Sequence, residues 1–358
     1  MNLEDQIDVK IGEVRTESLD LSFGEIANMG KDKELIIQPE YQRLFRWSTE
    51  QRSRLIESIL LELPIPQIFV IENSDGVFEL IDGLQRISTV LQFIEPNSIN
   101  LPALTLEGCD IIDGLNGVAY NNLPLSLKLR LKRSTVRTIV IKRQSKTFLR
   151  YEMFKRLNTG GSLLSPQEIR NCSSRMIGDD GVKFYGLLQE LSDIQSFKTS
   201  TSTLATPDLE QKANEELVLR FFAAKNARGM FHGNVRDWLD DYMESILLNK
   251  IPFDYDNERQ IFTDLFSEIE LKLGETAFVK FRGGNPLGGL APAYFEAIAI
   301  GCFNSLSVMK TKSQQQIRTA ITNLVQSSDF RDVTGPGANN KTKLEKRIQL
   351  ASEAVNAA

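Results

Sequence analysis

Two residues suited to binding an anion, Gly83 and Arg86, follow Asp82 near the end of the first quarter of the chain. Apolar residues at 77–81 predict a strand before them, and apolar residues three or four apart at 87–94 predict a helix after them. Glycine permits the sharp turn between the two. A helix that begins there directs unpaired N–H groups and a partial positive charge outward, and both favour phosphate. An ordinary β-to-α turn with a solvated arginine fits the same pattern.

A second segment, 41–47, combines arginines with aromatic rings. The planar guanidinium group can bind phosphate through two hydrogen bonds, and a neighbouring ring can stack on a base or support the arginine. A loop whose rings fill the core is the alternative interpretation. The candidate ligand-binding residues here are Tyr41, Gln42, Arg43 and Arg46.

The third segment, 154–171, joins two predicted helices through a turn made of Asn158, Thr159, Gly160 and the following glycine. These residues tolerate positive φ, so the turn could either bind an anion or simply reverse the chain. Ser165, Pro166 and Glu168 then have the spacing of a capping box with proline at the first helical position. Arg170 follows one turn into that helix, from where it could reach the turn.

A basic segment, 128–150, contains nine lysines or arginines and no acidic residue, in a chain whose net charge is -5. Such a segment can contact a nucleic-acid backbone, although a charged face exposed to solvent is an equally good explanation. Residues 136–141 within it have the composition of a strand. The candidate DNA-binding residues are Lys132, Arg133, Arg137, Lys142 and Arg143.

Composition places limits on the chemistry. With 358 residues, 41% of them hydrophobic and 25% charged, the chain is typical of a globular protein with two domains. Its single histidine, His232, excludes a histidine-rich metal site or an HNH-type nuclease within this sequence. The three cysteines are widely separated and give no disulfide framework. Because we find neither a signal-peptide pattern nor a long apolar run, we expect a cytoplasmic protein without a membrane span.

The elements indicate an α+β protein in three parts: a mixed-sheet domain at 1–175, a connecting helix and linker at 176–207, and a helical domain at 208–358. The linker is suggested by the low-complexity sequence at 199–203. Beyond it, helical periodicity predicts helices over 215–227, 235–248, 258–273, 290–303 and 314–326.

Taken together and in order, the three motifs resemble one family. They are Pro39-x-Tyr41-Gln42-Arg43-x-x-Arg46-Trp47, Asp82-Gly83-Leu84-Gln85-Arg86-x-x-Thr89, and Phe154-x-Arg156-Leu157-Asn158-Thr159-Gly160-Gly161-x-x-Leu164-Ser165-x-Gln167-Glu168-x-Arg170-Asn171. The chain is similar to the bacterial DGQQR-motif domain of GmrSD-type modification-dependent restriction proteins and of the SspE-type phage-defence effector. The motifs extend over roughly residues 35–175.

The resemblance implies a fold similar to the ParB/sulfiredoxin N-terminal domain, followed by helices. It also implies binding and hydrolysis of a nucleoside triphosphate with Mg²⁺, in support of nuclease action on phage DNA. Asp82 and Arg86 would be catalytic, with Asp82 positioning Mg²⁺ or water, and Gly83, Gln85 and Thr89 would join the residues of the other two motifs in binding the nucleotide. Leu84 departs from the family, which usually has Gln at that position. Because one histidine cannot supply an HNH domain, we expect a separate nuclease subunit, with DNA as a further partner and a homo-oligomer as one arrangement. The alternative is a DNA-binding or antitoxin-like regulator that uses the basic segment 128–150 and has no enzymatic activity.

Overall fold

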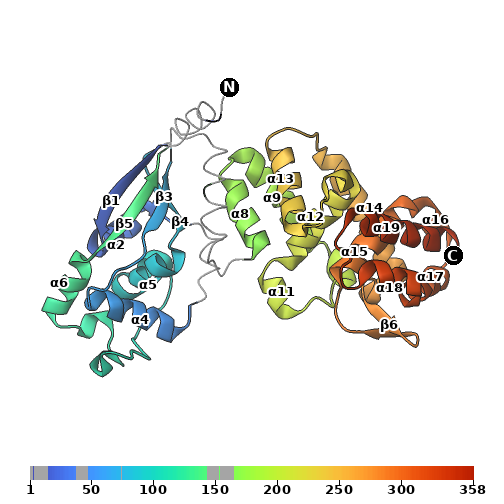
Figure 1. Cartoon of the computed structure of the whole chain (residues 1–358). Helices are drawn as coiled ribbons and strands as arrows, with labels where there is room; N and C mark the ends of the chain where they lie inside the picture. The colour runs from blue at the N-terminus through green and yellow to red at the C-terminus, as the bar shows by residue number, and fades with distance from the viewer. Residues whose placement is uncertain (1–2, 4–14, 38–46, 74, 143–152, 154–164) are drawn as a thin grey trace. The chain divides into compact units, whose positions relative to one another are not determined.

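The computed structural model describes residue 3 and residues 15–37, 47–73, 75–142, 153 and 165–358 (Figure 1). The chain divides into two compact units, Met1–Ser162 and Leu163–Ala358, and each is described by itself. The division falls earlier than the boundary near residue 175 that the sequence suggested. Residues 176–207, expected to contain a connecting helix and a linker, belong to the helical unit, where they form α9 (Asp179–Asp193), α10 (Gln195–Ser200) and a turn at 201–204.

The N-terminal unit is built on a five-stranded mixed sheet with strand order β1-β5-β3-β4-β2. β1 pairs antiparallel with β5, β5 pairs parallel with β3, β3 pairs antiparallel with β4, and β4 pairs parallel with β2. The strands are β1 (Thr16–Ser22), β2 (Leu35–Ile36), β3 (Ile68–Glu72), β4 (Phe78–Asp82) and β5 (Thr135–Ile141). The predicted strand at 136–141 corresponds to β5, which lies inside the sheet because its apolar residues are buried there.

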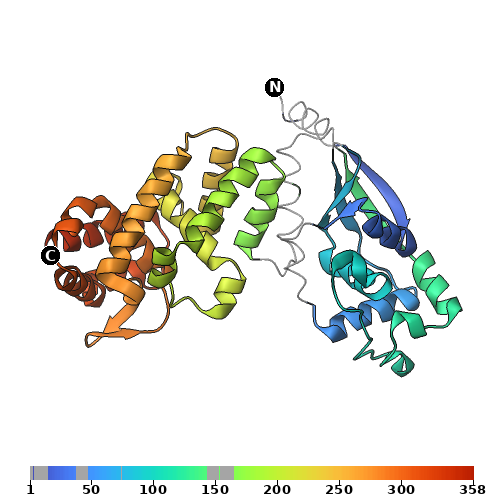
Figure 2. The same ribbon diagram turned by 180° about the vertical axis from the view of Figure 1, so that it is seen from behind.

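Among the described residues, four α-helices accompany the sheet: α2 (Phe23–Lys31), α4 (Thr49–Leu60), α5 (Leu84–Ile94) and α6 (Leu125–Arg133). α4 begins at the Ser48 capping box, in which the serine hydroxyl accepts from the Gln51 N–H group and the Gln51 side chain accepts from the Ser48 N–H group. α2 and α4 each contact both α5 and α6. Figure 2 shows this group of helices beside the sheet from behind. α5 is the central helix, with an unbroken buried run at its C-terminal end.

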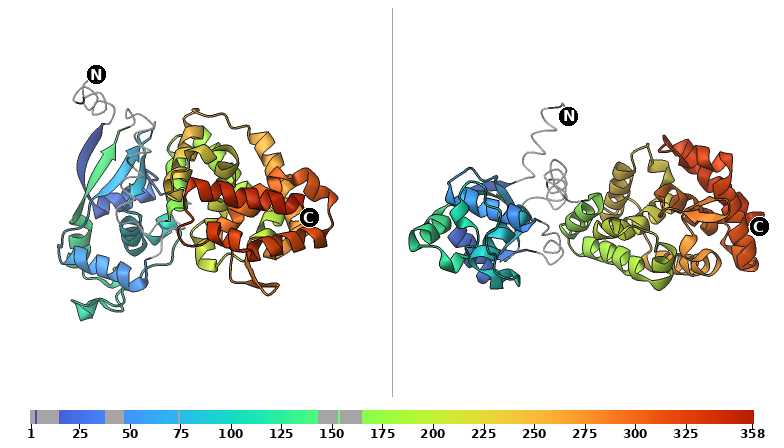
Figure 3. Two further views of the ribbon diagram at one scale, coloured as in Figure 1. Left: turned by 45° about the vertical axis from the view of Figure 1, so that its right-hand side comes forward. Right: turned by 90° about the horizontal axis from the view of Figure 1, so that it is seen from below.

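The second unit consists mainly of helices and includes one short hairpin (Figure 3). Each of the five helices predicted from periodicity is present, as α12, α13, α14, α15 and α17. The predicted fold class, a mixed sheet followed by a helical region, is therefore confirmed. The elements beyond α10 are α11 (Thr206–Glu210), α12 (Ala213–Asn226), α13 (Val235–Leu247), α14 (Tyr255–Leu273), β6 (Lys280–Arg282), β7 (Asn285–Leu287), α15 (Pro292–Asn304), α16 (Leu306–Thr311), α17 (Gln314–Gln326), α18 (Ser328–Thr334) and α19 (Lys341–Asn356), and α8 (Pro166–Arg175) precedes α9.

Phenylalanines form the centre of the helical unit. Phe197, Phe221, Phe262, Phe266 and Phe295 are all fully buried. The rings of Phe262 and Phe266 lie 4.3 Å apart between centroids, and Phe197 meets Phe266 edge to face at 4.9 Å. Aromatic contacts of this kind add stability beyond that of the buried apolar area alone. None of the helices in the described part of the chain is long and apolar enough to cross a membrane.

Candidate functional site

The turn between β4 and α5 is held in one conformation by Gly83. Its φ of +97° lies in the left-handed region, where a side chain is strained. A Cβ atom at this position would also lie 2.4 Å from Cγ2 of the buried Ile68 on β3. Glycine is therefore required here by backbone conformation and by packing, which confirms the predicted strand–turn–helix geometry.

The N-terminus of α5 faces outward from this turn. Its first helical hydrogen bond runs from the Ile87 N–H group to the Gly83 carbonyl oxygen. The N–H groups of residues 84–86 consequently have no acceptor within the helix. These residues are half-buried, so the positive end of the helix dipole lies near the surface of the unit.

Asp82 and Arg86 form an ion pair across the turn. The Arg86 Nη2 atom lies 3.0 Å from Asp82 Oδ2 and also donates to the Gln67 carbonyl oxygen at 3.0 Å. The exposed fractions of the two side chains are 33% for Asp82 and 19% for Arg86. Arg86 is thus fixed by two acceptors, while the carboxylate stays accessible to solvent.

Each member of this pair retains a polar atom with no hydrogen bond to the described residues. The Arg86 Nε atom is buried and has no acceptor among them, and Asp82 uses only Oδ2 in the ion pair. Buried donors are paired in most native structures, and an orphan calls for a specific explanation. The turn therefore places a positively charged guanidinium group beside a carboxylate oxygen.

Gln85 connects the turn to the end of the first motif. Its Oε1 atom accepts a hydrogen bond at 3.1 Å from the backbone N–H group of Trp47, just before α4. Thr89 lies one turn further along α5, is completely buried, and donates from its hydroxyl to the Gln85 carbonyl oxygen at 2.7 Å. Both residues therefore have structural roles that sequence reasoning missed. The nucleotide contacts assigned to them remain predictions, and Thr89 has no surface available for one.

Several predicted site residues lie outside the described part of the chain, so their placement is left open. They are Tyr41, Gln42, Arg43 and Arg46 of the first motif, Asn158, Thr159 and Gly160 of the third motif, and Arg143 of the basic segment.

Arg170 is instead the centre of a buried ion network within the helical unit. Its Nε atom donates to Asp240 at 2.7 Å, and its Nη1 atom donates to Glu216 at 3.1 Å and to Gln167 at 2.9 Å. The Nη2 atom donates to the Arg236 carbonyl oxygen at 3.2 Å. With 2% of the side chain exposed and every nitrogen engaged, Arg170 ties α8 to α12 and α13, and a nucleotide contact from it stays an untested prediction.

The basic segment is less free than its sequence suggested. Arg137 pairs with Asp20 of the neighbouring strand at 3.2 Å, and the hydrogen bond to that carboxylate raises the pKa of Arg137. Lys142 lies 2.5 Å from Glu17 and 3.8 Å from Glu72, and the hydrogen bond to Glu17 raises its pKa in the same way. Arg137 and Lys142, two of the residues predicted to contact DNA, therefore form ion pairs with β1 of the same sheet.

The remaining described candidates for DNA contact, Lys132 and Arg133, lie at the end of α6 and are exposed. The Lys132 amino group lies 6.0 Å from the centroid of the Tyr120 ring, which is within the range of a cation–π contact. Arg133 forms no ion pair with the described residues.

In the described part of the chain, no three His, Cys, Asp or Glu side chains converge on a metal position.

Comparison with known proteins gives one match. Residues 23–174 match the family model described as the N-terminal domain of the GmrSD restriction endonuclease. The matched region contains β2 to β5, the turn at Gly83 and α8, and its limits confirm the resemblance drawn from the three motifs. No match was found among curated proteins or among solved structures.

Proposed function

Because residues 23–174 belong to the family of GmrSD restriction endonuclease N-terminal domains, we propose that the chain is the nucleotide-binding component of a bacterial phage-defence restriction system. The single observation that carries this proposal is the turn at Gly83, where the ion-paired Arg86 and the outward N–H groups of α5 occupy the position of the family motif. We further propose that the bound ligand is a nucleoside triphosphate with Mg²⁺.

The geometry supports a phosphate at the N-terminus of α5. Backbone N–H groups at a helix start and an adjacent guanidinium group are the donors that phosphate oxygens prefer. Arg86 is held by Asp82 and Gln67, so little side-chain entropy would be lost when it binds an anion.

Asp82 could bind a metal ion, which the N–H and guanidinium groups that face phosphate cannot do. Mg²⁺ in nucleotide sites is commonly held by one or two carboxylates together with phosphate oxygens and water, and a half-exposed carboxylate beside the turn fits that role. The metal would shield charge on the phosphates when bound, while Arg86 would stabilise charge that develops during phosphoryl transfer. Leu84 has no polar group with which to orient an attacking water, so we place binding ahead of hydrolysis.

Because the single histidine of these 358 residues cannot build an HNH-type site, we propose that the nuclease activity lies outside them and that a partner subunit supplies it. In this arrangement the nucleotide-bound form of the chain would control when the nuclease acts on DNA.

The test compares two variants of the turn, Asp82→Ala and Arg86→Ala, with two control variants, Asp20→Ala and Arg137→Ala, which break a similar ion pair elsewhere on the same unit. Calorimetric titration with ATP or GTP and Mg²⁺ measures binding, and phosphate release measures hydrolysis. A hydrogen bond to a charged group contributes about 1.5–3 kcal/mol, so Arg86→Ala should weaken binding by roughly ten- to a hundredfold. Asp82→Ala should reduce phosphate release more than binding.

The controls should bind as the wild type does, because Asp20 and Arg137 lie on β1 and β5 and not at the turn. Equal binding by all variants and the wild type would refute the assignment of the site. Thermal unfolding of each variant separates loss of the site from loss of the fold.

The second candidate function is DNA binding without a nucleotide, favoured by the exposed Lys132 and Arg133 at the end of α6. It predicts that affinity for duplex DNA falls steeply as salt rises, since each phosphate contact releases a counterion. Binding that is unchanged by the nucleotide and lost in a Lys132→Ala, Arg133→Ala double variant would support it.

A further inference from the structure

An open groove of about 770 Å³ lies between the C-terminal end of α4 and α6 in the N-terminal unit. Phe23 and Ile59 are buried at its base, and apolar side chains from the connection after α4 and from α6 form its walls. Two of these wall residues are unusually exposed for leucines, at 45% for Leu63 and 37% for Leu129. Leu125, one turn before Leu129 on α6, is 71% exposed. Contiguous exposed apolar surface of this kind marks an interaction site more often than chance.

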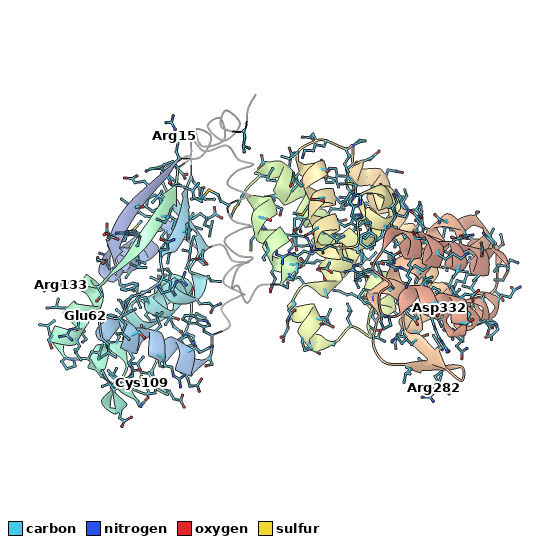
Figure 4. All side chains as sticks on the ribbon, viewed as in Figure 1. Arg15, Glu62, Cys109, Arg133, Arg282 and Asp332 are labelled. Atoms are coloured by element: carbon cyan, nitrogen blue, oxygen red, sulfur yellow. The ribbon has the colours of Figure 1, made fainter. Side chains whose placement is uncertain are left out.

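The rim of the groove is positively charged. Arg130 and Arg133 of α6 line it together with one acidic residue, Glu62. Glu62 lies 3.8 Å from Arg130, so this pair neutralises itself and leaves Arg133 as the uncompensated charge of the lining. Figure 4 labels Glu62 and Arg133 where α4 and α6 meet. In a chain with a net charge of -5, this is a local surface of opposite sign.

We propose that this groove, bounded by Leu63, Leu129 and Arg133, binds an acidic amphipathic helix of a protein partner. The apolar walls would accept the leucine-like face of such a helix, in the way that amphipathic helices bind in apolar grooves. Arg133 would pair with an acidic residue at its edge, and complementary charge at a rim promotes association and selects the partner.

A nucleic-acid backbone fits the groove less well than a protein helix. Phosphates require a row of cations and gain nothing from leucine side chains. The groove instead combines one uncompensated arginine with the apolar side chains of Leu63, Ile65 and Leu129 and with the uncharged hydroxyl groups of Ser126, Ser134 and Thr135. Apolar side chains beside a single charged residue match an amphipathic protein helix better than a row of phosphates.

The groove is also linked to the turn at Gly83 through one hydrogen bond. The connection that carries Leu63, Pro64 and Ile65 into the groove continues to Gln67, whose carbonyl oxygen accepts from Arg86. A helix docked on Ile65 would thus lie two residues from an acceptor that positions Arg86. The docking proposal stands independently of any nucleotide at that turn.

The test uses the full chain and a fluorescein-labelled amphipathic peptide of about 20 residues, which exceeds the roughly 12–15 residues below which an isolated helix is marginal. One face of the peptide carries leucines and the other glutamates, and a matched peptide carries lysine in place of each glutamate. Fluorescence anisotropy should show the acidic peptide binding at least about tenfold more tightly than the lysine peptide. Leu129→Glu should weaken the acidic peptide about tenfold or more, and Arg133→Glu about three- to tenfold.

Two exposed positions of the helical unit provide matched controls: Leu271→Glu and Arg282→Glu should leave binding unchanged. Equal affinity for the two peptides, or full binding by Leu129→Glu, would overturn the proposal. A DNA duplex that displaces the peptide would also overturn the proposal if its binding is lost in Arg133→Glu but kept in Leu129→Glu. That result would assign the surface to nucleic acid. Circular dichroism confirms that each variant folds, as expected for exposed positions.

Discussion

Replacing Gly83 with alanine tests the geometry on which the candidate site depends. Alanine at a φ of +97° costs about 1–2 kcal/mol in backbone strain. Its Cβ atom would also lie 2.4 Å from Ile68 Cγ2, and relieving such overpacking in a buried position costs about 1–3 kcal/mol more. We therefore expect Gly83→Ala to destabilise the N-terminal unit by about 2–5 kcal/mol.

Gly117→Ala separates the two costs. Gly117 has a similar φ of +81°, but a Cβ atom there meets no other atom within 4 Å. This variant should lose only the backbone cost of about 1–2 kcal/mol. Urea unfolding in a Trp238→Phe background reports on the N-terminal unit, because Trp47 is then the only tryptophan. Equal losses in free energy of unfolding for the two variants would refute the claim that packing against Ile68 fixes the turn.

The helical unit gives three further predictions. Arg170→Met should lower its free energy of unfolding by about 3–5 kcal/mol, because the buried Asp240 and the partly buried Glu216 each lose an ionic partner. Arg259→Met, which breaks an exposed pair, should cost at most about 1 kcal/mol in the same urea titration. Burial opposes ionisation of Glu216, but the guanidinium groups of Arg220 and Arg170 outweigh it and lower the Glu216 pKa below its usual 4.5. The stability that ionised Glu216 contributes is complete above pH 4.5 and is lost as the pH falls through the lowered pKa. The free energy of unfolding of a Glu216→Gln variant should therefore depend less on pH below 4.5. Burial raises the pKa of Cys302 to about 12, so Ellman's reagent should leave this thiol unmodified in the folded protein and react with it in urea; modification in the native state would contradict the buried placement.

Features that depend on residues close together in the chain could be predicted from the sequence. The strand, glycine turn and helix around Asp82 follow from local periodicity, and the capping box at Ser165 follows from residues three positions apart. This box is present with reciprocal hydrogen bonds, because capping is decided within a single helical turn.

Features that depend on residues far apart in the chain could not be predicted in this way. The motif predicts a ligand contact for Arg170 but not its ion pair with Asp240, which is 70 residues away in sequence. The basic segment predicts a DNA contact for Arg137 but not its ion pair with Asp20, which is 117 residues away. Such pairings depend on which strands and helices become neighbours. The Gln67 carbonyl oxygen that holds Arg86 left no signal, because a backbone acceptor is common to every residue type.

The central claim is that phosphate oxygens bind the N–H groups at the start of α5, and amide hydrogen exchange measures those groups directly. Exchange is followed by mass spectrometry with and without Mg²⁺ and ATP or GTP, using peptides that cover residues 82–89. We predict that the nucleotide slows exchange in this segment of the wild type and has no such effect in Arg86→Ala. Exchange that is unchanged in this segment under saturating nucleotide, or slowed equally in Arg86→Ala, would contradict the account.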